Sequence, residues 1–236
     1  MPKNDSPKLN NKFIFEIRYK PNSKVLDFRG TWAEKISAHM KLSEWRIVEN
    51  RVDVLDQDAK NHGFVGFRNS GFVSNDVPTA NYFPDQAVKF FKYVLELDGF
   101  DSPLFVTRIG VRSKFYRAFE GNFDDLLKRY STRYLVLTDQ AKEIMRADLV
   151  DIGGPVNFSD SHGNFNTMSG PMNDEQAKKF LDGKNDLPKV GLYFEIDYWQ
   201  KPEKQVENAN ILQLISIFSK ESWNKYEGIC KLVTED

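Results

Sequence analysis

Large apolar side chains alternate with polar ones in several short stretches of the chain. The clearest alternation is in KFIFEIRYK, where four apolar side chains share one face: Phe13, Phe15, Ile17 and Tyr19. A period of two is typical of a strand with one buried face. Similar patterns predict further strands at 45–55, 62–74, 104–116 and 189–199.

Two segments between these strands have the period of an amphipathic helix. Residues 31–42 follow Gly30, with Thr31 as the N-cap and Trp32, Ile36, His39 and Met40 on one face. Residues 84–100 begin at Pro84 and end near Gly99. The order over 12–116 is therefore β-α-β-β-α-β, the order of a ferredoxin-like unit.

The second half shows a weaker form of the same order. Helices are predicted at 122–133, 138–147 and 173–181, and strands at 134–137, 148–158, 164–172 and 189–199. We expect an α+β fold with a mixed or antiparallel sheet. It forms either two ferredoxin-like halves, 12–120 and 121–236, or one continuous domain, after a disordered tail at 1–11.

The long C-terminal helix is apolar along one main stripe: Ile211, Ile215, Phe218, Tyr226, Ile229 and Cys230. Leu212, Leu214 and Ile217 extend the apolar surface beyond this stripe. Such a helix is either sandwiched in the core or part of an oligomer interface.

The stretch GGPVNFSDSHGNFNTMSGP (153–171) reads as a hairpin. Its symmetry places Gly154 opposite Pro171 and makes SDSHGN the turn. A catalytic interpretation pairs Ser161 or Asp160 with His162, but sequence neighbours do not converge as a nucleophile and its base must. We therefore expect a turn and name no catalytic residue.

The composition disfavours several chemistries. The net charge of −1 gives no global attraction to nucleic acid. His39, His62 and His162 are isolated from one another and from Cys230, so we expect no metal site, and the absence of phosphate-binding glycine motifs predicts no cofactor. The chain has no leader-like start and no long apolar run, so a cytoplasmic protein without a membrane segment is expected.

HGFVGF lies where ferredoxin-like RNA-binding modules carry their stacking aromatics. Phe64 and Phe67 are three residues apart, however, and point to opposite faces of a regular strand. Base stacking would need a bulge at Gly66, and packing against a helix is the simpler interpretation.

The candidate binding residues come from polar stripes on three strands. We expect these side chains to meet on one sheet face: Glu16, Arg18, Arg108, Arg112, Tyr193, Glu195, Asp197 and Trp199. One interpretation is a solvated face with cross-strand ion pairs. The other is a polar groove, flanked by Tyr193 and Trp199, that binds a carboxylate or phosphate through its arginines.

FIFEIRY, TRIGVRSKF and GLYFEIDYW together resemble a sporadically distributed family of uncharacterised bacterial proteins with an RIG-L/V-RY segment. The chain has Ser113 where that family usually has an aromatic residue. The resemblance implies no known activity, and the sporadic distribution implies a mobile or defence-associated context.

We expect a non-enzymatic binding or assembly protein that self-associates or binds a protein partner. The alternatives are a nucleic-acid-binding protein of duplicated ferredoxin-like type and a carboxylate- or metal-dependent hydrolase.

Overall fold

The structure, a computed structural model, describes residues 8–58, 60–100, 102–182 and 184–235. Within these residues the strands are β1 (Leu9–Tyr19), β2 (Glu44–Val48), β3 (Arg51–Leu55), β4 (Asn61–Gly66), β5 (Asn69–Asn75), β6 (Leu104–Ala118), β7 (Gly154–Asp160), β8 (Gly163–Asn173), β9 (Val190–Gln200) and β10 (Lys204–Val206). The helices are α1 (Lys24–Met40), α2 (Tyr82–Leu95), α3 (Phe123–Arg133), α4 (Asp139–Met145), α5 (Asp174–Phe180) and α6 (Asn208–Thr234).

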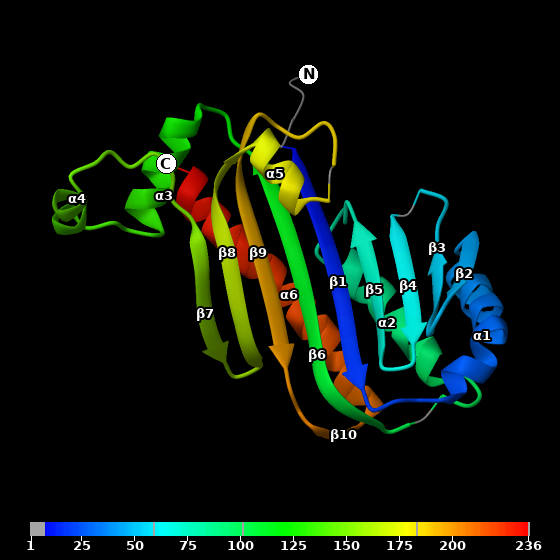
Figure 1. Cartoon of the computed structure of the whole chain (residues 1–236). Coiled ribbons are helices and arrows are strands. Elements are labelled where there is room, and N and C mark those ends of the chain that lie inside the picture. The colour runs from blue at the N-terminus through cyan, green and yellow to red at the C-terminus, as the bar shows by residue number, and fades with distance from the viewer. Residues whose placement is uncertain (1–7, 59, 101, 183, 236) are drawn as a thin grey trace.

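All ten described strands belong to one antiparallel sheet (Figure 1). Their order is β2-β3-β4-β5-β1-β6-β9-β8-β7, and β10 pairs with β6. Helices α1, α2, α3 and α6 pack on one face, which we call the helix face, while α5 covers only one end of the other, the open face. The predicted α+β class, with an antiparallel sheet and a long C-terminal helix, is confirmed.

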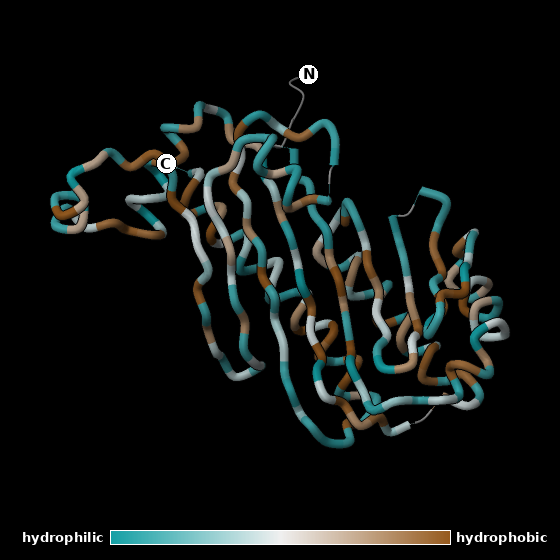
Figure 2. Tube along the Cα trace, viewed as in Figure 1, coloured by the Kyte–Doolittle hydropathy of each residue, from teal (hydrophilic) through white to brown (hydrophobic). Residues whose placement is uncertain are grey.

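The alternation in the central strands builds the core on the helix face. Phe13, Phe15 and Ile17 of β1 point to this face and are at most 1% exposed. The corresponding residues of β6 and β9 join them: Ile109, Val111, Phe115, Phe194, Ile196 and Tyr198. Figure 2 shows brown and teal positions alternating along these strands. One-sided burial with this alternation is the usual pattern of an antiparallel sheet that faces water on one side.

The C-terminal helix closes the core across the middle of the sheet. Ile215 and Phe218 of α6 are fully buried. The Tyr226 ring stacks on Phe115 of β6 with centroids 4.0 Å apart, and Phe218 stacks on Tyr198 of β9 at 4.5 Å. The buried stripe of α6 therefore belongs to the core of a single chain.

The first half is richer in strands than the β-α-β-β-α-β order predicted. The segments 45–55 and 62–74 are not single strands, because each turns back on itself as a hairpin, β2–β3 and β4–β5. The order β6-β1-β5-β4 matches a ferredoxin-like sheet, and β2 and β3 extend it at the outer edge. Asn50 and Arg68, polar residues in the middle of each segment, lie at the turns of the two hairpins.

The second half does not form a ferredoxin-like unit. Residues 134–137 are not a strand: the Tyr134 ring packs edge-on against Tyr130, and the Leu135 N–H donates to the Tyr130 carbonyl at the end of α3. Without that strand β8 and β9 are direct neighbours, and β9 pairs with β6. The strands of both halves lie in one continuous sheet.

Two boundaries near the start of the chain also differ from the predictions. Of the predicted tail 1–11, residues 1–7 lie outside the described residues, but β1 begins at Leu9, and its Asn11 side chain is held by both backbone groups of Val77. Helix α1 begins at Lys24 and runs through Gly30 and Thr31, so Thr31 is not its N-cap.

The hairpin β7–β8 pairs Gly154 with Ser169, two residues away from the predicted partner. The Asp160 carboxylate accepts from the backbone N–H groups of His162 and Gly163, which centres the turn one residue earlier than the sequence symmetry suggested. His162 is exposed in this turn.

Ile215→Asp should prevent folding. It places a charge without a partner in the fully buried interface of α6 with the sheet, at a cost of several kcal/mol. The measurement is circular dichroism with size-exclusion chromatography. Leu232→Asp on the same helix is the control, since Leu232 is 46% exposed and should tolerate the change. A folded Ile215→Asp monomer would contradict the assignment of α6 to the core.

Candidate functional site

The eight residues proposed from the sequence all lie on the open face, on β1, β6 and β9. Glu16 is opposite Gly110, Gly110 is opposite Trp199, and Arg112 is opposite both Ile14 and Asp197. Because directly opposed residues of antiparallel strands point to the same side, one face collects all three polar stripes. Ion pairs form between strands on this face, as expected in the first of the two interpretations, a solvated face with cross-strand ion pairs.

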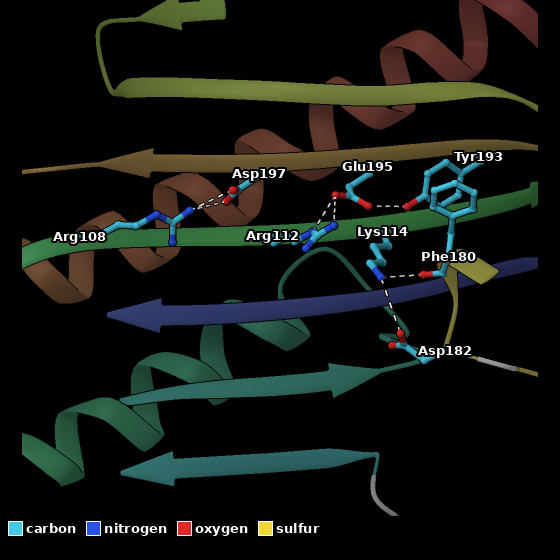
Figure 3. A network of polar contacts seen from close by, with 8 residues as sticks. All are labelled: Arg108, Arg112, Lys114, Phe180, Asp182, Tyr193, Glu195 and Asp197. Atoms are coloured by element: carbon cyan, nitrogen blue, oxygen red, sulfur yellow. Dashed lines mark hydrogen bonds and ion pairs between the residues drawn. The ribbon is translucent and has the colours of Figure 1, made fainter. Parts of the chain in front are cut away.

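Arg108 reaches along the face to Asp197 (Figure 3). Its Nη2 donates to both Asp197 carboxylate oxygens, at 2.8 and 3.0 Å. The guanidinium passes over Gly110, where an added Cβ would lie 3.2 Å from Arg108 Nη1 and 2.7 Å from the Tyr198 carbonyl oxygen. The missing side chain at Gly110 therefore leaves the space in which this pair forms.

Arg112 and Glu195 form a second pair, whose carboxylate is more deeply buried than that of Asp197. Arg112 Nε lies 2.7 Å from Glu195 Oε1, and the Tyr193 hydroxyl donates to Oε2 (Figure 3). The Glu195 side chain is only 8% exposed, whereas that of Arg112 is 48% exposed. Burial and the adjacent Glu195 carboxylate raise the pKa of Tyr193 far above its usual range, so the phenol stays a hydrogen-bond donor.

Tyr193 does not flank an open groove, contrary to the second interpretation. Helix α5 covers this end of the face, and the Phe180 ring packs against Tyr193 with centroids 4.8 Å apart. Lys114 lies under the same cover and donates to the Phe180 carbonyl at 2.6 Å. Burial lowers the pKa of Lys114 from its ordinary value, despite the nearby carboxylates of Asp182 and Glu195.

The uncovered part of the face holds two adjoining hollows. The first, about 430 Å³ and here called the arginine hollow, is lined by Ile14, Glu16, Arg18, Arg108, Gly110, Arg112 and Asp197. The second, about 570 Å³ and here called the hairpin hollow, is lined by Arg18, Tyr19, Lys20, Pro21, Arg68, Asn69 and Thr107. Trp199 is partly exposed and lies opposite Gly110 at the border of the first.

Positive charge is in excess around these hollows. Their linings contain five basic side chains and two carboxylates, although the whole chain has a net charge of −1. Arg18 pairs with Glu16 and is also directly opposite Arg108, a like-charged neighbour. Like charges in opposed positions are unfavourable unless negative charge lies between them.

Lys20 and Arg68 were not identified from the sequence. Lys20 lies over the Phe105 ring, 3.8 Å from its centroid, and Arg68 lies near the Phe67 ring. Among the described residues, neither has a carboxylate within ion-pair distance. Arg68 is in the turn between β4 and β5, so recognising that hairpin in FRNSG would have placed it beside Arg18.

A separate cluster surrounds Asp53 on β3. This carboxylate is fully buried on the open face, with Arg51 Nε at 2.9 Å, Arg46 Nε at 3.2 Å and His62 Nε2 at 3.3 Å. Burial alone would raise the pKa of Asp53. The contact with His62, the charge of Arg51 and the hydrogen bond from Arg46 outweigh burial and hold the pKa of Asp53 below its usual range.

The other residues singled out in the sequence are not joined in a site. Phe64 is buried on the open face with the Arg51 guanidinium 5.2 Å from its ring centroid, and Phe67 lies in the turn, so the two form no stacking surface. His39 is exposed rather than in the core, and its ring stacks on Tyr93 at 3.9 Å.

In the described part of the chain, no three His, Cys, Asp or Glu side chains are grouped as metal ligands. None of its helices combines the length and the apolar character that a membrane span requires. Comparison with protein-family models and with curated proteins finds no match for the chain. Function must therefore be inferred from the geometry of the site.

Arg112→Ala should lower the free energy of unfolding by about 2–3 kcal/mol, because it leaves the buried Glu195 carboxylate without its charge partner. Urea denaturation measures the change. Arg108→Ala is the matched control: Asp197 is 28% exposed and can be hydrated, so the loss there should be about 1 kcal/mol or less. Equal losses in the two variants would contradict the difference in burial.

Asp53 should make stability depend on pH in the acid range. Its folded-state pKa is lowered, so its contribution is complete above the unfolded value of about 3.9 and is lost as the pH falls from there through the lower folded-state value. Wild type should therefore lose its stability advantage over Asp53→Asn on acidification. Urea denaturation at neutral pH and at about pH 3 measures this. Asp98→Asn is the control, because the Asp98 side chain is 91% exposed; a wild-type advantage over Asp53→Asn that is undiminished in acid would refute the prediction.

Proposed function

We propose that the chain is a non-enzymatic binding protein whose open face holds an acidic segment of a partner protein. The observation that carries this proposal is the excess of positive charge around the two hollows, which share Arg18. Three of the five basic residues are already paired with carboxylates: Arg18, Arg108 and Arg112. Lys20 and Arg68 carry the positive charge that no carboxylate of the face neutralises, and this charge attracts an acidic ligand.

The ion pairs support this role by fixing the arginines in place. Arg108 and Arg112 are held by Asp197 and Glu195, so little side-chain entropy remains to be lost when a ligand binds. Guanidinium groups match carboxylate and phosphate geometry. An extended acidic segment can lie from the hairpin hollow into the arginine hollow, with Trp199 at its border.

The resemblance to a sporadically distributed family implies no activity, but an assembly role agrees with the defence-associated context that it implies. Both remain predictions from the sequence, as does a cytoplasmic location. The nucleic-acid alternative is less well supported, since Phe64 and Phe67 do not share an exposed face.

The test is binding of a fluorescein-labelled peptide of alternating glutamate and serine, measured by fluorescence anisotropy. Arg18→Gln combined with Lys20→Gln and Arg68→Gln should raise Kd by roughly tenfold or more. The melting temperature should change little, because these side chains are exposed. Binding should also weaken with added salt.

The matched control removes the same charge from the helix side, through Lys92→Gln, Lys220→Gln and Lys231→Gln. This variant should bind the peptide as wild type does. Equal losses in both variants would show nonspecific attraction and refute the site. No binding by wild type at low salt would refute an acidic partner on this face.

A further inference from the structure

Strand β2 lies at one end of the sheet, and its outer edge has no neighbouring strand within the described chain (Figure 1). All five of its residues are exposed. Trp45 and Ile47 are opposite the core residues Val54 and Val52, so they lie on the helix face, and they are 43% and 47% exposed. A sheet edge with unpaired backbone groups and apolar side chains is a template for a further strand.

The hydrogen bonds of β3 show which backbone groups of β2 point outward. The Phe67 N–H donates to the Asn50 carbonyl, on the β4 side of β3. Because backbone direction alternates along a strand, the even-numbered residues of β3 bond toward β4 and the odd-numbered ones toward β2. The odd-numbered residues are opposite the even-numbered residues of β2. The N–H and C=O groups of Trp45 and Ile47 are therefore directed away from the sheet.

The other end of the sheet is protected, whereas this end is not. Strand β7 contains Pro155, which pairs with Met168 in the β7–β8 register but has no N–H. Its position is therefore an outward one, where a proline removes a donor that an incoming strand would need. Strand β2 contains no proline and offers both of its outward N–H groups.

A second copy of β2 fits this edge in one antiparallel register. Hydrogen bonds across the new pair require outward residues to be opposite one another, so a twofold axis must pass through a residue of β2. An axis at Glu44 opposes two glutamates, and an axis at Arg46 opposes two arginines. With the axis at Ile47 or Val48, neither charged residue meets its opposite. With the axis at Trp45, Glu44 of each copy is opposite Arg46 of the partner subunit.

The side chains can form these two pairs because they lie on the same side of the sheet. Arg46 is opposite Asp53 on the open face, and Glu44, two residues away, shares that face. Arg46 contacts Asp53 through Nε at 3.2 Å, yet its side chain is 62% exposed. Two guanidinium groups, those of Arg46 and Arg51, surround the single Asp53 carboxylate. The partner's Glu44 supplies the second negative charge.

We propose that the outer edge of β2 is a self-association site, at which two copies join antiparallel about a twofold axis at Trp45. The sheet then continues from one copy into the other, and Trp45 lies beside the partner's Trp45 on the helix face. The paired segment is short compared with standard interfaces, so the dimer should be reversible and depend on concentration. This proposal does not depend on the function of the open face.

Sedimentation velocity of the full chain over a range of concentrations tests the proposal. Wild type should shift from monomer to dimer as the concentration rises. Ile47→Pro removes an outward N–H and no hydrogen bond within the sheet, so it should leave a folded chain by circular dichroism and raise the dissociation constant by roughly tenfold or more. Glu44→Lys, at an exposed position, should weaken the dimer similarly through repulsion from the partner's Arg46.

The matched control is Asn157→Pro on β7, which is exposed and has the same outward direction as Pro155. It should dimerise as wild type does. Weaker association of Asn157→Pro would indicate head-to-tail pairing of β2 with β7 and overturn the proposal. A wild-type chain that stays monomeric, or an Ile47→Pro variant that dimerises as wild type does, would also overturn it.

Cysteine cross-linking tests the register. A mixture of a Glu44→Cys chain with an Arg46→Cys chain should form a disulfide-linked dimer under mild oxidation, seen on a non-reducing gel. Neither chain alone should do so, because identical positions are offset by two residues in this register. Cys230 is buried and should not react. Cross-linking of either variant alone would indicate an axis at Glu44 or Arg46 and refute the proposed register, as would a mixture that does not cross-link.

Discussion

The register of β1, β6 and β9 determines both faces of the molecule. One pairing places Phe15 opposite Val111 and Val111 opposite Tyr198, and so directs these side chains toward α2 and α6. The same pairing places Arg112 opposite Asp197 on the other side. A slip of one residue would exchange the faces, exposing the apolar rows and burying the charged ones. Burial of the apolar side chains therefore determines which charged side chains meet on the open face. The ion pairs contribute little to the choice of register, because burial of the core already fixes it.

The open face combines order with an excess of charge. Glu195 and Asp197 hold Arg112 and Arg108 in fixed positions. Lys20 and Arg68, by contrast, lie over or near aromatic rings beside a hollow and have no carboxylate within ion-pair distance among the described residues. Paired arginines are pre-organised but largely neutralised, whereas the other two cations attract anions from a distance. A surface with both properties suits a partner that is acidic and extended.

The sequence pattern correctly predicted the features that follow from the period of apolar residues, the central strands and their faces. It did not predict the features that depend on turns, the two hairpins of the first half. Alternation identified the central strands and brought all eight proposed residues to one face, because side-chain direction in a strand follows directly from position. It did not divide 45–55 and 62–74 into hairpins, although each has a turn residue near its centre, Asn50 and Asn69, because neither is followed by the Gly that marks a two-residue hairpin loop. Arg68 was missed for that reason. The cover of α5 over Tyr193 and the fully buried Asp53 arise from tertiary packing, which a pattern along the chain does not encode.

Strand β6 pairs with strands from both halves of the chain, and this limits how much of the sheet can form during synthesis. Its residues pair with β1, already synthesised, and with β9, where 83 positions separate Arg112 from its ion partner Glu195. Until β9 is made, one long edge of β6 has no hydrogen-bonding neighbour and its apolar side awaits α6. Such an edge is a template for pairing with other chains. Contacts so distant in sequence also slow folding. While the residues between β6 and β9 are being synthesised, the exposed edge of β6 is thus prone to pair with other chains. The end of β6 does not complete a domain that could fold before the rest of the chain is made.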